Sequence, residues 1–266
     1  MLLRPAHAKP IGQCCAIAIM AKASIPGQTK TRLSPPLTPI EAADLNTAFL
    51  RDIIDNVARA AEQADIASFV AFGPPGAAPF FEDCLPAHVG LMEVWLPDLG
   101  ECLIQTAQSL LDLGYGAAVV LNSDSPTLPT ERLVATARAL AAPGERIVLG
   151  PCEDGGYYLL GLKHPHRRLF QDIAWSTQRV ARQTLERAGE LDLEVVRLAP
   201  WYDVDDLDSL RKLIGETAAR SANGGMSGAY FPSHSAAVLR RLIDAADFAD
   251  RIGPVRDAGF PAASIA

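Results

Sequence analysis

Apolar residues follow two alternating patterns along this chain. Short continuous runs alternate with longer segments in which apolar residues recur every third or fourth position. The short runs predict strands buried on both faces, and the longer segments predict helices with one apolar face. The predicted strands lie at residues 14–21, 67–72, 89–96, 117–121, 146–151 and 193–198. This alternation predicts an α/β fold around a mostly parallel sheet with right-handed crossovers.

The first predicted helix has the clearest start signal. Thr38 as N-cap, Pro39 at the first position and Glu41 at the third form a capping box. Apolar residues then recur every fourth position, so the helix is expected to continue to about Gln63. Further helices are predicted from Asp98 to Gly114, after Pro129, from Trp175–Thr177 to Gly189, and over residues 236–248.

Residues 146–162 contain two apolar runs joined by Asp154-Gly155-Gly156. Such a turn favours an exposed hairpin. The alternative is that the glycines allow the backbone to approach a ligand closely. We prefer the hairpin, because a turn between two apolar runs is typical of one.

Composition divides the chain into three parts. Residues 1–13 are expected to be a loose leader, residues 14–215 a nucleotide-binding catalytic domain, and residues 216–266 a linker with a helical extension. The linker is expected because residues 215–234 are small, polar and rich in Gly and Ser. The short apolar run after the leader is better explained as a first strand than as a secretory signal.

Charge and cysteine content narrow the function. A net charge of −7 and a pI near 5.2 argue against bulk electrostatic binding to nucleic acid or to an anionic membrane, so a phosphate site must be local. Five cysteines without a CxxC pair suit a reducing cytoplasm. The 49% hydrophobic content suits a sizeable core, and no segment looks long enough to span a bilayer.

Candidate chemistry gathers where predicted strands end. Asp124 follows the strand at 117–121, and the turn at Ser125-Pro126 leaves its carboxylate pointing into a crevice. The loop after the first strand carries Lys30, Thr31 and Arg32 beside Gly27, which suits a di- or triphosphate. This loop lacks the Walker A spacing.

An acidic segment follows the last predicted strand. Asp203, Asp205, Asp206 and Asp208 crowd the start of a helix, and capping explains one or two of them. In a parallel sheet the loops with Lys30, Asp124 and Asp205 open on the same edge. Two carboxylates facing bound phosphate predict a Mg²⁺ (or Mn²⁺) site.

His164 and His166 form the motif HPH after the predicted hairpin. They have no third partner at metal-ligand spacing in the sequence, which favours a loop role over zinc.

The chain resembles the bacterial DUF2064 family, also called transferase 1, rSAM/selenodomain-associated, over about residues 14–215. The resemblance rests on six segments in the family's order: MAKASIPGQTKTRL, DLGECL, NSDSPTLP, LGPCEDGGYYLLGL, AWSTQRV and YDVDDLDSL. That family belongs to the nucleotide-diphospho-sugar transferase superfamily and is similar to 2-phospholactate guanylyltransferases. The resemblance implies a GT-A fold, a Rossmann-like three-layer sandwich around a mostly parallel mixed sheet.

The resemblance also implies roles for individual residues. Asp124 and Asp205 would be metal ligands, and Glu153 and Asp154 would line the acceptor or sugar side. Catalytic roles would fall to Lys30, Arg32, Asp124, Glu153 and Asp154. Nucleotide or phosphate contacts would come from Ala21, Lys22, Gly27, Lys30, Thr31, Arg32, Ser123, Gly155 and Gly156.

Two positions depart from the family pattern. DVDDLDSL lacks a Thr-Pro pair, which Asp206 would replace as a cap, and Cys102 stands where a basic residue is expected. The second departure argues against an extra phosphate contact from that helix.

The sequence as a whole predicts a Mg²⁺-dependent, nucleotide-using transferase of the cytoplasm. The basic loop suits a bound triphosphate, which favours nucleotidyl transfer to a small phosphorylated or oxyanion acceptor with pyrophosphate release. Glycosyl transfer from a nucleotide sugar is the alternative, and a catalytically silent nucleotide-binding module is a third. The expected partners are a nucleotide or nucleotide sugar and a small acceptor, with room for a homodimer.

Overall fold

The computed structural model describes residues 1–6, 11–223, 228–245 and 247–253. Its eight strands form one sheet in the order β1-β4-β3-β2-β5-β7-β6-β8. The strands are β1 (Leu2–Arg4), β2 (Cys15–Lys22), β3 (Ile66–Gly73), β4 (Gly90–Glu93), β5 (Ala117–Asn122), β6 (Arg146–Pro151), β7 (Tyr157–Leu162) and β8 (Glu194–Arg197). The helices are α1 (Pro39–Ala61), α2 (Ala78–Cys84), α3 (Leu99–Asp112), α4 (Thr130–Ala141), α5 (Val180–Glu190), α6 (Leu207–Asn223), α7 (Ser233–Ile243) and α8 (Phe248–Ile252).

The sheet is mixed but mostly parallel, as predicted. β2 pairs in parallel with β3 and β5, β3 with β4, and β6 with β8. β7 runs antiparallel between β5 and β6, so the predicted hairpin is confirmed. The parallel strands of the centre therefore deliver their following loops to one edge of the sheet.

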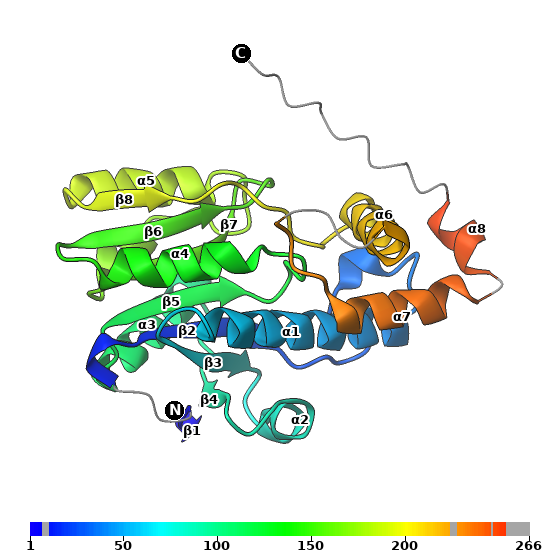
Figure 1. The fold of residues 1–266 in the computed structure, drawn as a ribbon, viewed down its shortest axis with the longest axis horizontal. Helices are drawn as coiled ribbons and strands as arrows, with labels where there is room; N and C mark the ends of the chain where they lie inside the picture. The colour runs from blue at the N-terminus through cyan, green and yellow to red at the C-terminus, as the bar shows by residue number, and fades with distance from the viewer. Residues whose placement is uncertain (7–10, 224–227, 246, 254–266) are drawn as a thin grey trace, which may run out of the picture.

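Helices cover both faces of the sheet and make three layers (Figure 1). α1 and α4 pack on one face, where Leu50, Ile53 and Leu133 meet strand side chains such as Ile17 and Val119. α3 and α5 pack on the other face against alternate strand residues, which agrees with the period of two along a strand. This arrangement confirms the three-layer α/β sandwich of the nucleotide-diphospho-sugar transferase type.

The first helix begins as the sequence predicts. The Thr38 hydroxyl accepts a hydrogen bond from the Glu41 N–H, and the Glu41 carboxylate accepts one from the Thr38 N–H at 2.7 Å. Asp98 caps α3 through the Glu101 N–H at 3.0 Å. Each cap satisfies a backbone donor that the helix cannot pair internally, worth about 1 kcal/mol.

The start of α5 differs from the prediction. The helix begins at Val180, not at residues 175–177, because the Thr177 hydroxyl donates back to the Ala174 carbonyl at 2.7 Å. Ser176 has a φ of 60°, which is incompatible with a right-handed helix. Residues 174–179 therefore form a loop.

The ends of the chain also differ from the prediction. Leu2–Arg4, within the expected loose leader, forms an edge strand antiparallel to β4. α6 continues to Asn223, through residues expected to be linker. The predicted helix at 236–248 is replaced by α7 and α8, and its residue 246 lies outside the described part, as do residues 224–227 of the expected linker.

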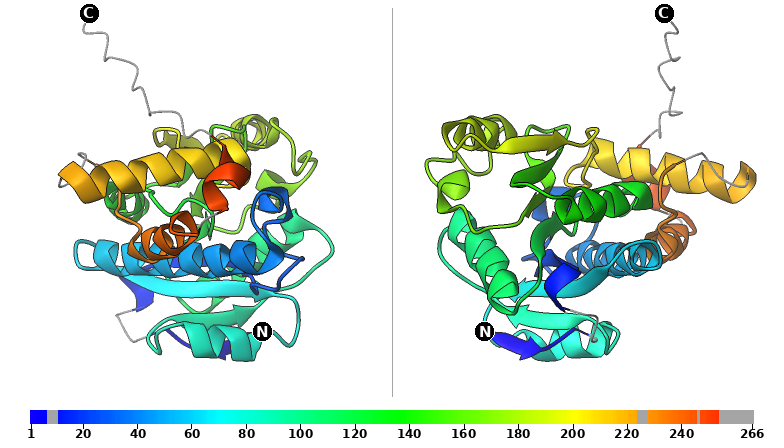
Figure 2. Two further views of the ribbon diagram at one scale, coloured as in Figure 1. Left: turned by 90° about the vertical axis from the view of Figure 1, so that its right-hand side faces the viewer. Right: turned by 60° about the vertical axis from the view of Figure 1, so that its left-hand side comes forward.

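The C-terminal helices pack on α1 and on the loop after β2. Leu239 of α7 and Leu210 of α6 share an apolar cluster with Phe49 of α1 and with Leu33 and Leu37 from the loop after β2. Figure 2 (left) looks onto this end, where α7 lies beside α1 and α6 lies next to α7. Among the described helices, none is both long and apolar enough to cross a membrane.

Candidate active site

A cleft of about 810 Å³ opens at the carboxyl ends of β2, β3 and β5. One wall is the loop after β2, with Lys30, Thr31 and Arg32, and Asp124 lies at the tip of β5. Asp154 and Asp205 line it from loops distant in sequence. The edge of the sheet that the sequence selects for ligand binding is thus the edge where the cleft forms.

Lys30 lies at the centre of the polar end of the cleft. Its ammonium nitrogen is 2.8 Å from Asp124 Oδ1 and 2.6 Å from Asp205 Oδ1, and it donates to the Val204 carbonyl at 2.9 Å. The Lys30 side chain is only 6% exposed. Burial by itself lowers the pKa of Lys30, but the two carboxylates outweigh it and the net pKa is raised. Lys30 is therefore a fixed cation at this site.

A backbone hydrogen bond joins the two acidic strand tips. The Val204 N–H donates to the Asp124 carbonyl at 2.8 Å, which places residues 203–205 beside residues 122–125. Asn122 donates to the Ser125 hydroxyl at 3.2 Å and steadies the turn after β5. The structure thus brings Lys30, Asp124 and Asp205 together, as predicted.

Asp203 joins the cluster, and sequence reasoning did not single it out. Burial raises the pKa of Asp203 to about 7, and the carboxylates of Asp205, Asp154 and Asp124 add to the shift. Ligand atoms of Asp203, Asp154 and Cys152 lie within 4.8 Å of one another. The sequence showed an acidic run at residues 203–208, but it could not distinguish the carboxylates that cap the helix from those that lie near Asp124.

The other two aspartates of that run have structural roles. Asp206 Oδ1 accepts a hydrogen bond from the Ser209 N–H at 2.8 Å, so Asp206 replaces the missing Thr-Pro cap as expected. Asp208 is 91% exposed and pairs with Arg211 at 3.1 Å. The acidic run thus divides into Asp205, which lines the cleft, Asp203, which is coupled to the cleft carboxylates, and two residues that stabilise the start of α6.

A buried threonine fixes the basic loop. The Thr29 hydroxyl donates to the Ala23 carbonyl at 3.1 Å and accepts from the Ile25 N–H at 3.0 Å. Gly27 has a φ of 78° in the turn that these bonds close. The loop is consequently shaped before any ligand arrives, with Arg32 exposed on its surface and Lys30 directed inward.

The loop after β6 contributes unevenly to the cleft. Asp154 and Gly156 line it, and the Asp154 carboxylate is held by the Gly156 N–H at 2.8 Å. Gly155 has a φ of 91°, and a Cβ there would meet the Gln178 carbonyl oxygen at 2.3 Å. Glu153 pairs with Lys212 at 3.5 Å and lies outside the cleft lining. Glycine at 155 is therefore explained by packing.

The far end of the cleft is apolar. Trp95, Leu99, Leu103 and Trp175 line it with Tyr157, and Ala21, Lys22 and Ser123 lie along the floor between the two ends. Cys102 also lines this end, and its thiol donates to the Leu96 carbonyl at 3.5 Å. Cysteine thus fits the turn before α3, where the family resemblance suggested a basic residue.

Two buried polar atoms in this cleft lack a protein partner. Within the residues that the structure describes, the Tyr157 hydroxyl and the Asn122 Oδ1 make no hydrogen bond. An unpaired buried polar group costs about 1–3 kcal/mol, so such atoms are uncommon unless a ligand or water pairs with them. Both atoms are candidates for ligand contact that the sequence did not reveal.

The donor set at the polar end suits a hard divalent cation. Asp124, Asp203, Asp205 and Asp154 offer carboxylate oxygens, which Mg²⁺ and Mn²⁺ prefer. Three of these side chains raise the pKa of Asp203 by repulsion, and a cation would relieve that repulsion. The residues present therefore fit the metal that the resemblance implies.

Comparison with known proteins agrees with this architecture. Residues 56–177 match the family described as "Uncharacterized protein conserved in bacteria (DUF2064)". A 2-phospho-L-lactate guanylyltransferase of Haloarcula marismortui is 28% identical over 198 residues, which cover 74% of this chain and 84% of the relative.

A solved structure extends the agreement to three dimensions. It is a candidate nucleotide-diphospho-sugar transferase from Desulfovibrio desulfuricans G20, 27% identical, with a TM-score of 0.73. The match covers 85% of this chain and 94% of that one. The chain is thus a transferase with the fold of the nucleotide-diphospho-sugar transferases, and its residues 56–177 are similar to the DUF2064 family.

Proposed function

We propose that this protein transfers a nucleotidyl group from a nucleoside triphosphate to a small phosphorylated or oxyanion acceptor. The observation that carries the proposal is the buried Lys30 ammonium, held between Asp124 and Asp205 beside an exposed Arg32. Two cations on one preformed loop suit the β- and γ-phosphates. The guanylyltransferase relative supports the same class of reaction.

The chain's own groups account for most of what this reaction needs. An acceptor oxyanion attacks the α-phosphorus, a new P–O bond forms, and the bond to the β-phosphate oxygen breaks with release of pyrophosphate. Lys30 and Arg32 stabilise the negative charge that grows on the leaving pyrophosphate. Fixed charges in a partly buried cleft need little rearrangement as the reaction proceeds, which is why they are effective.

Asp124 and Asp205, with Asp203 beside them, would hold Mg²⁺ or Mn²⁺. When bound, such an ion neutralises phosphate charge. The Lys30 contacts hold both carboxylates in place. The apolar end, with Trp95 and Trp175, offers flat surfaces for a nucleobase or an apolar part of the acceptor.

Glycosyl transfer from a nucleotide sugar is a second candidate. Asp154 favours glycosyl transfer, because its carboxylate lines the cleft and is oriented by a hydrogen bond from the Gly156 N–H. A general base needs such a fixed position within reach of the substrate. Glu153 is less suited to that role, since it pairs with Lys212 outside the cleft lining. A silent nucleotide-binding module would use the same contacts without turnover.

One assay separates the three functions. The purified protein is incubated with Mg²⁺ and each nucleoside triphosphate or nucleotide sugar, together with a pool of phosphorylated and carboxylate acceptors. Pyrophosphate release supports nucleotidyl transfer, and release of nucleoside diphosphate from a nucleotide sugar supports glycosyl transfer. Thermal stabilisation by nucleotide without any product identifies the silent module.

A matched pair of variants tests the cleft itself. Asp124→Asn removes a cleft carboxylate, whereas Asp208→Asn removes a 91% exposed carboxylate near the same cleft. We expect the first variant to lose Mg²⁺-dependent nucleotide binding and the second to keep it. Unchanged nucleotide affinity in Asp124→Asn would refute the metal role.

A further inference from the structure

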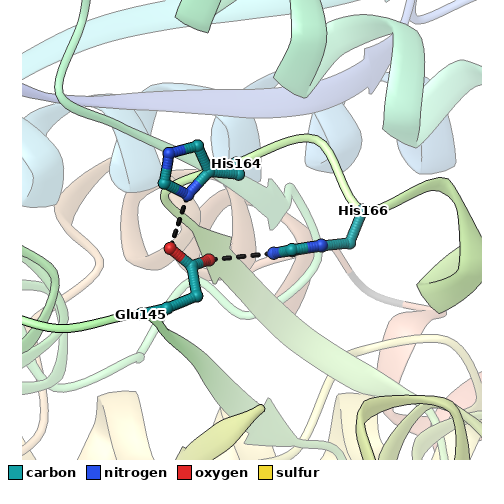
Figure 3. A group of neighbouring side chains, drawn as sticks. All are labelled: Glu145, His164 and His166. Atoms are coloured by element: carbon teal, nitrogen blue, oxygen red, sulfur yellow. Dashed lines mark hydrogen bonds and ion pairs between the residues drawn. The ribbon is translucent and has the colours of Figure 1, made fainter. Parts of the chain in front are cut away.

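A second group of metal-binding side chains lies outside the cleft (Figure 3). Glu145 lies between two imidazoles, with its Oε2 2.5 Å from His164 Nδ1 and its Oε1 2.9 Å from His166 Nε2. One ligand atom from each of the three residues lies within 4.8 Å of the others. Glu145 supplies the third partner that HPH lacked in the sequence.

The group is at the opposite edge of the sheet from the cleft. Glu145 precedes β6 and His164 follows β7, and these two strand ends are adjacent because Ile147 pairs with Leu162. β7 runs antiparallel to β5, so its end is remote from the tip that carries Asp124. Six residues of strand span about 20 Å. The group is therefore independent of the proposed active site.

Both loops are held in place by bonds that do not involve the three side chains. The Lys163 ammonium donates to the carbonyls of Ala142 at 2.9 Å and Gly144 at 2.8 Å. The His166 N–H donates to the His164 carbonyl at 2.9 Å, which closes a tight turn around Pro165. The site is thus built on a pre-shaped backbone.

The three side chains are accessible from solvent. His166 is 25% exposed and His164 69% exposed, so solvent ions reach the group and the His164 ring has room to adjust.

We propose that Glu145, His164 and His166 bind a divalent transition-metal ion, with Zn²⁺ as the best fit. Two imidazole nitrogens and one carboxylate oxygen are a common zinc donor set, with water in the fourth position. Tetrahedral bonds of about 2.0–2.1 Å put neighbouring donors about 3.3 Å apart. The three ligand atoms lie within 4.8 Å of one another, and the 2.5 and 2.9 Å separations run to different oxygens of Glu145, so each donor pair needs to shift by no more than about 1.5 Å to reach this distance.

Binding requires that both coordinating nitrogens present a lone pair. Each proton that now joins an imidazole nitrogen to Glu145 moves to the other ring nitrogen or to solvent. Mg²⁺ prefers oxygen donors and does not compete well at nitrogen. The bound ion would tie the loop before β6 to the loop after β7, closing the open end of this hairpin.

Zinc titration of the full chain by calorimetry, in excess Mg²⁺ to fill the cleft, tests the proposal. We expect one zinc equivalent, bound at least tenfold more weakly in His164→Ala, His166→Ala and Glu145→Gln. His88→Ala is the matched control, because it removes an exposed histidine elsewhere. Zinc should also raise the Tm of the wild type and the control, but not of His166→Ala.

Two results would overturn the proposal. One is zinc binding that survives in His166→Ala but is lost in Asp203→Asn, since the ion would then occupy the cleft group with Cys152. The other is the absence of saturable zinc binding to the wild-type chain. X-ray absorption of the zinc-loaded wild type checks the donors without relying on any variant: imidazole and oxygen support the site, and a sulfur donor contradicts it.

Discussion

At the scale of single residues, the clearest feature is a lysine whose ammonium group contacts two carboxylates. Lys30 is almost wholly buried and contacts Asp124 and Asp205 at once. Arg32, two residues away, is exposed and pairs with neither. The two cations therefore differ in what their loss would do, although both are adjacent to the same cleft.

Arg32→Ala should weaken binding of nucleoside triphosphate about tenfold or more and barely change binding of monophosphate. The reason is that a charged hydrogen bond contributes about 1.5–3 kcal/mol and Arg32 is assigned to the phosphate tail. Calorimetry with both ligands measures the difference, and Arg51→Ala, an exposed arginine on α1, is the control. Equal losses for both ligands would contradict the assignment.

Lys30→Ala is not equivalent to Arg32→Ala, because it also leaves Asp124 and Asp205 without their shared cation.

Tyr157→Phe tests whether the unpaired hydroxyl in the cleft serves a ligand. The variant removes a buried group without a described protein partner, so stability should be unchanged or slightly increased. Affinity for the nucleotide or the acceptor should fall by about tenfold, the loss of one net hydrogen bond at an otherwise intact site. Urea unfolding and ligand titration measure the two effects separately.

A loss of stability without any loss of affinity for either ligand would show that Tyr157 serves packing alone.

At the scale of elements, α1 positions much of the molecule. Its Asp52 is buried and accepts hydrogen bonds from the backbone N–H groups of His234 and Ser235 at 2.8 Å each. The carboxylate of one helix thus caps the start of α7, 182 residues later. The sequence could not show this, because the cap and the helix that it stabilises are far apart along the chain.

Burial raises the pKa of Asp52 to about 6, against the lowering effect of those hydrogen bonds. The unfolded value is about 3.9, so the folded state holds the proton more tightly. Its stabilising contribution is complete below about pH 4 and is lost as the pH rises through about 6. Across that range, the wild type should lose about 3 kcal/mol relative to Asp52→Asn.

Urea unfolding of both proteins at pH 4–7 measures this difference. The nearby His234–Asp55 pair is present in both proteins, so the comparison isolates Asp52. A constant difference in the free energy of unfolding across the range would show that Asp52 ionises normally.

At the scale of the whole molecule, the C-terminal helices belong to the same packed body as the cleft loops. Leu239 of α7 shares an apolar cluster with Leu33 and Leu37, which lie in the same loop as Lys30 and Arg32. The basic loop therefore rests on residues that lie outside the family resemblance at 14–215. We therefore expect the C-terminal extension to support the proposed nucleotide site.

Leu239→Ala should destabilise the protein by about 2–5 kcal/mol, because the side chain is 1% exposed and leaves a cavity. We also expect nucleotide affinity to fall severalfold, since the loop that carries Lys30 loses support. Leu140→Ala is the control: Leu140 is equally buried, but it packs in a different cluster under α4. Equal nucleotide affinity in the two variants would refute the link.

The sequence by itself determined the features that depend on near neighbours. Apolar periodicity located the strands and helices, and the capping box at Thr38 and the cap at Asp98 fixed two helix starts. It also placed Lys30, Asp124 and Asp205 at one edge, because parallel strands share a polarity. These inferences succeed because backbone hydrogen bonding and side-chain period act over a few residues.

Only the tertiary structure decided which side chains share a partner. It placed Asp203 beside the cleft carboxylates, turned Glu153 toward Lys212, and brought Glu145 to His164 and His166 across 19 and 21 residues. It also delayed the start of α5 to Val180. Contacts of this kind depend on chain crossings and on competition between donors and acceptors, and no local pattern in a sequence records either.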